Sequence, residues 1–119
     1  MILNYDSDKY VDLSRLDSVN FDDGGISLTW KMKQDSTEEV TRGVFRSIPR
    51  NKWLNESEAG ESVICQIENA FREAVLKGEP LFDFDSVFSI IMEQPDNSDF
   101  LKSYNAFAKE WRKRTCLKK

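Results

Sequence analysis

The side chains most able to do chemistry in this sequence are carboxylates. Glu56, Glu58 and Glu61 lie close together, and Asp83 and Asp85 are two residues apart. Carboxylates at such spacings can divide acid and base roles between them. The chain contains no histidine, however, so the commonest general base at neutral pH and the commonest metal ligand are both missing. The sequence therefore predicts a protein that is not an enzyme.

Two acidic stretches, residues 20–24 and 83–85, do not match the spacing of a calcium-binding loop. Around Asn20 to Gly24 no glycine falls at the sixth place and no Glu closes a twelve-residue loop, and no glycine follows Asp83-Phe84-Asp85. Gly24-Gly25 precedes an expected strand, whereas a phosphate cradle precedes a helix N-terminus. We therefore expect no metal and no cofactor.

Charge is segregated along the chain, whose net charge is −4. Residues 80–100 carry five acidic residues and no basic one, while residues 101–119 carry seven basic residues and one Glu. Such blocks serve solubility when they pair within the fold, and they steer a charged partner when they do not. The long acidic block favours a basic macromolecule, such as a nuclease, as the partner.

Aromatic and acidic side chains occur together in that block. Complementary charge speeds encounter, and aromatic anchors supply binding energy. For Phe82 and Phe84, a place beside the core is the alternative role. The candidate partner-binding residues are Phe82, Asp83, Phe84, Asp85, Glu93, Asp96, Asp99 and Tyr104.

The basic residues give an alternative, nucleic-acid-binding interpretation. Cations neutralise phosphates, and an exposed ring can stack on a base. The pI of about 4.9 argues against this role, because nucleic-acid-binding domains are typically strongly basic. The candidates are Arg42, Arg46, Arg50, Lys52, Trp53, Arg112, Lys113 and Arg114.

Two short stretches resemble the immunity proteins of nuclease colicins. Residues 92–101 are similar to that family's Glu-His-Pro-x-Gly-Ser-Asp-Leu-Ile, and residues 109–112 resemble its closing Lys-Glu-Trp-Arg. Gln94 and Asn97 stand where the family has His and Gly, and Lys102-Ser103 replaces its Tyr-Tyr pair. The resemblance implies a toxin as the partner and adds weight to Glu93 and Asp99. It covers under a fifth of the chain and implies nothing about the fold, because that family is all-helical.

Strand and helix periods predict an α+β fold that forms a single domain over residues 1–119. Ile26, Leu28, Trp30 and Met32 alternate with polar residues, which predicts a strand over 26–33 paired as a hairpin with a second strand over 39–48 that Pro49 ends. Three C-terminal helices are predicted over 61–77, 86–94 and 98–115, with Gly78 as a C-cap and Asp85 as an N-cap. Residues 1–25 look irregular, with one or two helical turns capped by Asp8 and a turn over 21–25.

No stretch is apolar enough to span a membrane, and the first residues do not resemble a secretion signal. We therefore expect a cytoplasmic bacterial or phage protein without a membrane partner. The favoured function is a small acidic protein-binding inhibitor of the immunity or antitoxin type. The alternative is a nucleic-acid-associated regulatory protein that uses the hairpin and the C-terminal helix.

Overall fold

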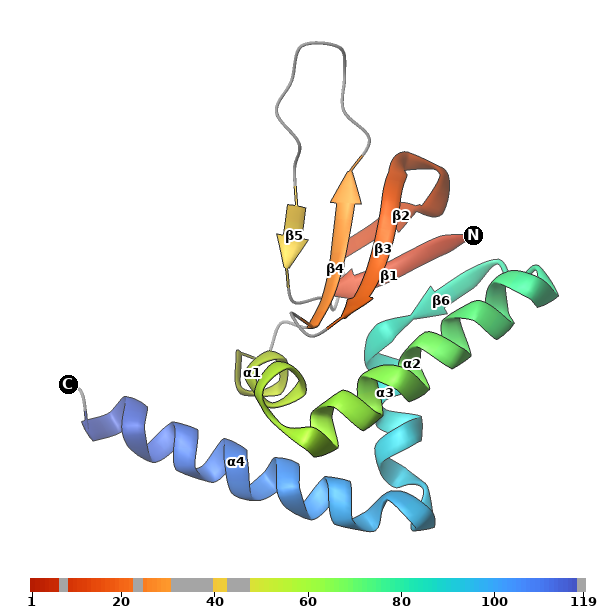
Figure 1. The fold of residues 1–119 in the computed structure, drawn as a ribbon. Coiled ribbons are helices and arrows are strands. Elements are labelled where there is room, and N and C mark those ends of the chain that lie inside the picture. Colours follow the sequence, from red (N-terminus) through yellow and green to blue (C-terminus); the bar gives the residue numbers. More distant parts are fainter. Residues whose placement is uncertain (7–8, 23–24, 31–39, 43–47, 118–119) are drawn as a thin grey trace.

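A computed structural model describes residues 1–119 except 7–8, 23–24, 31–39, 43–47 and 118–119 (Figure 1). In the described residues, the N-terminal part consists mostly of strands and the C-terminal part mostly of helices. The protein therefore has the predicted α+β fold. The elements are β1 (Ile2–Asp6), β2 (Lys9–Asp12), the 3-10 helix η1 (Leu13–Arg15), β3 (Leu16–Asp22), β4 (Gly25–Trp30), β5 (Val40–Arg42), α1 (Ile48–Glu56), α2 (Glu58–Lys77), β6 (Leu81–Asp83), α3 (Phe84–Glu93), the 3-10 helix η2 (Pro95–Asn97) and α4 (Ser98–Leu117).

The predicted hairpin is present as the antiparallel pair β4 and β5, with Leu28 opposite Thr41. Its strands form a sheet of order β3-β4-β5 in the described residues. Ile26 and Leu28 are buried, as the alternation of polar and apolar residues predicts. The outer parts of the two predicted strands, residues 31–33, 39 and 43–47, lie outside the described residues.

The second predicted strand extends too far along the chain. Helix α1 begins at Ile48, and Pro49 lies in its first turn instead of ending a strand. Proline suits this position because its fixed φ fits the helix and its missing N–H would have no partner there. Helix α1 has almost no apolar periodicity, since Trp53 and Leu54 are adjacent and its other residues after Pro49 are polar. The sequence therefore gave no helical signal here.

The prediction of irregular chain for residues 1–25 is wrong, because this segment forms strands. Strands β1, β2 and β6 make a second sheet of order β2-β1-β6, in which β1 and β6 are parallel. β3 pairs antiparallel with β4, and Asp22 lies opposite Gly25, so the chain reverses within the predicted turn over 21–25. The helical turn is η1, capped by Asp12, whereas Asp8 lies outside the described residues.

The three predicted helices are confirmed, with boundaries that shift by a few residues. Helix α2 begins after Ser57, whose hydroxyl accepts a hydrogen bond from the backbone N–H of Gly60 at 2.8 Å. It ends at Gly78, whose φ of 70° lies in the left-handed region that glycine adopts readily. Asp83, not Asp85, caps α3.

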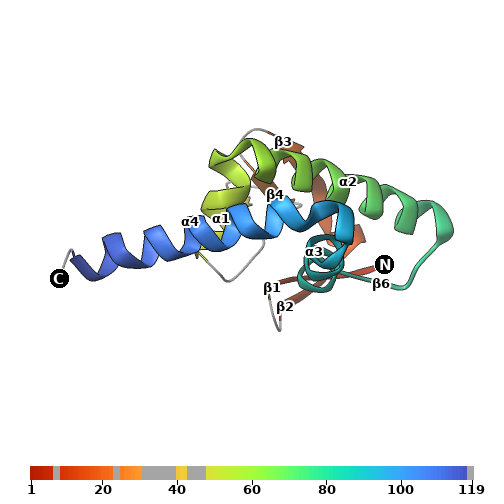
Figure 2. The same ribbon diagram turned by 90° about the horizontal axis from the view of Figure 1, so that it is seen from below.

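Helix α2 is central to the packing. It contacts β3 and β4 as well as the other three helices. The largest fully buried side chains come from several layers: Leu3 and Leu28 from the sheets, and Trp53, Ile67 and Phe84 from the helical part. Seen from below, the C-terminal half of α4 extends beyond the other elements (Figure 2). The core therefore holds both sheets against α2, while α4 leaves half its length at the periphery.

Candidate protein-binding groove

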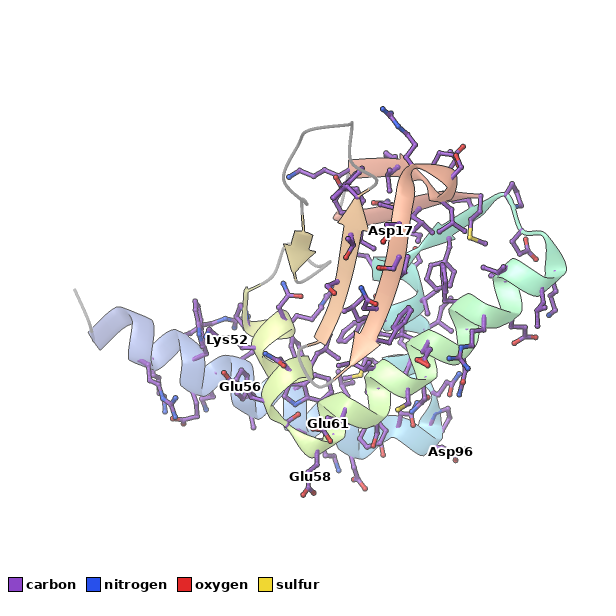
Figure 3. The ribbon with its side chains drawn as sticks, turned by 45° about the horizontal axis from the view of Figure 1, so that its top comes forward. Asp17, Lys52, Glu56, Glu58, Glu61 and Asp96 are labelled. Carbon is purple, nitrogen blue, oxygen red and sulfur yellow. The ribbon has the colours of Figure 1, made fainter. Side chains whose placement is uncertain are left out.

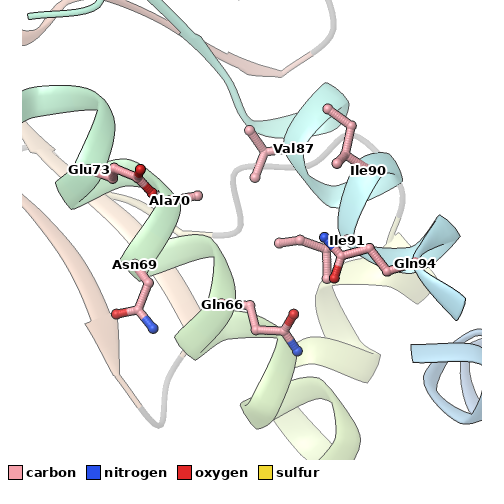
Figure 4. Close-up of a pocket in the computed structure, with 8 residues that line it drawn as sticks. All are labelled: Gln66, Asn69, Ala70, Glu73, Val87, Ile90, Ile91 and Gln94. Atoms are coloured by element: carbon pink, nitrogen blue, oxygen red, sulfur yellow. The ribbon is translucent and has the colours of Figure 1, made fainter. Parts of the chain in front are cut away.

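An open groove runs between helices α2 and α3 and encloses about 420 Å³ (Figure 4). Helix α2 supplies its mostly polar wall and α3 its mostly apolar wall. The lining residues are Gln66, Asn69, Ala70, Glu73, Val87, Ile90, Ile91 and Gln94. Figure 4 shows Val87 and Ile91 directed from α3 toward α2. The helices thus leave an apolar floor with a polar rim.

Ile90 is the apolar lining residue most open to solvent. Its side chain is 60% exposed, whereas the adjacent Ile91 is 5% exposed. The buried stripe of α3 consists of Phe84, Phe88, Ile91 and Met92, and Ile90 lies outside it. Ile90 thus extends the apolar surface of the groove to the solvent-exposed side of α3.

Asn97 contacts three of the residues that line the groove. It is 7% exposed. Its Nδ2 lies 3.2 Å from Gln66 Oε1 and 3.3 Å from Gln94 Oε1, and it donates to the Ile91 carbonyl oxygen at 2.8 Å. These contacts tie the α2 wall to the α3 wall through one buried amide. Three lining residues are therefore positioned before any partner arrives.

The segment that builds both walls is strongly acidic. Residues 58–99 contain ten acidic and two basic residues, a net charge of −8 in a chain whose total is −4. On the rim, Lys77 Nζ lies 2.7 Å from Glu73 Oε1. The hydrogen bond from Lys77 holds the pKa of Glu73 below its ordinary value, so this carboxylate stays ionised.

Three predicted carboxylates lie exposed at the corner where α3 meets α4. These are Glu93, Asp96 and Asp99, and within the described part of the chain none of them forms an ion pair. Glu93 lies three residues from Ile90 and therefore shares its exposed helix face. We call these three residues the acidic corner.

Asp83 and Asp85, two further candidates, are partly exposed and contact neighbouring elements. Asp83 accepts hydrogen bonds from the Ser86 backbone N–H at 3.2 Å and from Asn4 Nδ2 at 3.3 Å. Asp85 Oδ1 pairs with Arg50 Nη1 at 2.7 Å. Both carboxylates thus hold α3 to its neighbours.

Of the aromatic candidates, Phe82 and Phe84 lie in the core and Tyr104 packs against it. Phe82 is 4% exposed and Phe84 is fully buried, and their rings meet edge to face at 5.0 Å. Tyr104 is half-buried, with its ring centroid 5.4 Å from that of Trp53 and 6.0 Å from that of Phe88. Phe82 and Phe84 therefore have the second role that the sequence allowed, which is packing in the core.

The nucleic-acid candidates do not form one surface. Trp53 is fully buried and its Nε1 donates to Ser103 Oγ at 3.1 Å, so its ring is closed to a base. Arg50 pairs with Asp85 and lies 4.3 Å above the Phe88 ring. Lys52 is exposed on α1, and Arg112, Lys113 and Arg114 are exposed on α4. Arg46 and the side chain of Arg42 lie outside the described residues.

Three of the carboxylates first considered for acid and base chemistry, Glu56, Glu58 and Glu61, are on the surface, as is Asp96. Figure 3 shows Glu56, Glu58 and Glu61 around the corner between α1 and α2, and Asp96 near the start of α4. All four are exposed. Among the described residues, no group of three or more Asp, Glu or Cys side chains could hold a metal ion. Within the same residues, no helix has the length and apolar character needed to cross a membrane.

Sequence reasoning missed most of the groove. Gln66, Asn69 and Ala70 carry no signal of a site, because their importance depends on where α3 packs. The doublet Ile90-Ile91 was the available clue, since only one of the two fits the buried stripe.

Comparison of the chain with models of protein families, with curated proteins and with solved structures finds no match.

Proposed function

We propose that this protein is a small acidic inhibitor of the immunity or antitoxin type, which neutralises a toxin such as a nuclease by covering its active or substrate-binding surface. The observation that supports this proposal is the apolar groove whose two walls belong to a segment of net charge −8. A nuclease must hold phosphates and therefore presents a basic surface.

The arrangement has the parts that a tight protein interface needs. Ile90 and the groove floor supply an apolar centre that a partner can desolvate. The acidic corner lies beside them and speeds encounter with a cationic surface. Steering by charge predicts an association rate that falls as salt rises.

The experiment is cross-linking of the protein in its own host, followed by reconstitution with each purified partner. We expect a basic toxin whose activity falls as one equivalent of the protein is added. Neutralising the acidic corner with Glu93→Gln, Asp96→Asn and Asp99→Asn should slow association at least tenfold at low salt.

A matched control removes three exposed carboxylates elsewhere, with Asp17→Asn, Glu79→Gln and Glu110→Gln. It makes the same change in net charge and should alter association much less. The proposal fails if no partner is inhibited, or if the two triple variants behave alike.

The projecting end of α4 favours a second candidate, a nucleic-acid-associated regulator. Arg112, Lys113 and Arg114 lie in this part of α4 and are exposed. A gel shift with a salt titration separates the two functions. Binding that weakens steeply with salt and is lost when these three residues become Gln supports the regulator, whereas no shift counts against it.

A further inference from the structure

We infer that the α2–α3 groove seats a cationic amphipathic helix of the partner protein, with one branched apolar side chain of that helix packed against Ile90 and Ala70. This inference rests on the proposed function and specifies the site through which it acts. The observation behind it is a preformed groove that is apolar inside and acidic around.

The apolar interior defines what enters the groove. Val87, Ile90 and Ile91 line one side and Ala70 the other. None of these four side chains can form hydrogen bonds, so a polar group placed among them would lose its water without replacement. A Leu, Ile or Val side chain instead gains burial on both sides.

The groove is held open for that side chain by its own contacts. The buried Asn97 amide fixes Gln66 and Gln94 on opposite walls. A helical ligand presents its side chains three and four residues apart, which matches the spacing along α2 and α3 of the residues that line the groove. A preorganised seat reduces the entropy that binding costs.

Charge defines the flanks of the occupant. Glu73 is already engaged by Lys77, whereas Glu93 lies exposed one turn from Ile90 and forms no ion pair within the described part of the chain. Glu93 and the acidic corner therefore favour Lys or Arg beside the apolar anchor. An acidic or neutral helix would meet repulsion or gain nothing.

A second copy of this chain fits the groove less well. Its cationic element is α4, whose C-terminal half exposes Lys109 and Arg112 but keeps Ala108 buried and Phe107 and Trp111 half-buried. Over residues 107–114, whose burial the structure describes, α4 therefore presents cations without a fully exposed large apolar side chain. Self-association is an outcome of the test.

The test is an NMR titration of the full ¹⁵N-labelled chain with three synthetic 14-residue helical peptides. The first carries Leu on one face and Lys on the other, the second replaces Lys by Glu, and the third replaces Leu by Ala. We expect saturable amide shifts at residues 66–73 and 87–94 with the Leu–Lys peptide only. Shifts elsewhere, or equal binding of all three peptides, would overturn the inference.

Two groove variants separate the apolar from the charge contribution. Ile90→Ser removes the apolar contact and should weaken binding about tenfold, which is typical of losing one anchor. Asn69→Lys places a cation on the rim and should weaken binding of the Leu–Lys peptide severalfold, because the two cations repel each other. Both positions are exposed, so the fold should tolerate either change.

Leu76→Ser is the matched control. Leu76 is 88% exposed on α2 and is not part of the groove lining. Its substitution should leave binding unchanged, and an effect equal to that of Ile90→Ser overturns the inference. Sedimentation of the chain alone gives the remaining arm: a dimer that Ile90→Ser dissociates would assign the groove to a second copy instead.

The failures of the two proposals are distinguishable. If a toxin is inhibited equally by wild type and by Ile90→Ser, the inhibitor function stands and the groove is not its site. If the Leu–Lys peptide binds in the groove but no toxin is inhibited, the groove stands and the proposed function fails.

Discussion

Helix α2 meets its neighbours α1 and α3 in different ways. At the α1 contact, a Cβ added to Gly60 would overlap the Trp53 carbonyl oxygen and lie 2.6 Å from Leu54 Cα. At the α3 contact, the ring of Phe71 stacks with that of Phe84, while the side chains that line the groove stand apart. The first contact is closed by backbone against backbone, and the second is tied by Asn97. We infer that the close contact with α1 stabilises the fold, whereas the looser contact with α3 leaves the groove open to a binding partner.

Gly60→Ala should have the largest effect, because it breaks the closed contact. The added methyl group meets rigid backbone, so we expect a loss of about 3 kcal/mol in the free energy of unfolding, measured by urea denaturation. Gly78→Ala is the matched control. That site has open space but a φ of 70°, so its cost should be about 1 kcal/mol. Equal losses at the two glycines would contradict the proposed difference.

Asn97→Ala should have an intermediate effect on stability and a specific effect on the groove. Removing the buried amide leaves its acceptors without this donor, at an expected cost of about 1–2 kcal/mol. The Gln66 and Gln94 side chains should then become more mobile, which side-chain amide NMR relaxation measures. Asn69→Ala changes an exposed lining residue and should cost less than about 0.5 kcal/mol. A rigid groove in the Asn97 variant would show that other contacts hold it.

The smallest effect concerns the groove rim and depends on pH. In Lys77→Ala, the pKa of Glu73 should rise toward its ordinary value of 4.5, because the hydrogen bond that lowers it is gone. In the wild type, the lowered pKa stabilises the fold above pH 4.5, and this contribution is lost as pH falls through the folded-state pKa. A ¹³C titration of the Glu73 carboxyl in both variants measures the shift. An unchanged Glu73 titration would exclude Lys77 as its cause.

The helices could be predicted because their signals are local. The apolar stripe of α2 and the glycine at its end lie within one short segment, and the alternation in β4 does as well. The strand pairing of β1 could not be predicted, since Leu3 finds its neighbour Phe82 far along the chain. Helix α1 lacks a stripe, and β6 has three residues, too few to show a period.

The candidate site was predictable in its charge but not in its shape. Exposure of Glu93, Asp96 and Asp99 follows from their polarity. Phe82 and Phe84 flank Asp83 in a two-residue alternation that turns both rings inward, so the aromatic residues of the acidic block support the fold. The groove depends on how two helices pack, which no single segment of sequence encodes.

The parallel pairing of β1 with β6 has a consequence for biosynthesis. Of these two strands the ribosome makes β1 first, and Leu3 must wait for Phe82 before it gains its place. Until then an apolar strand remains without its neighbour while the intervening chain emerges. The sheet that contains β1 is therefore completed only after β6 has been made, later in synthesis than the β3-β4-β5 sheet.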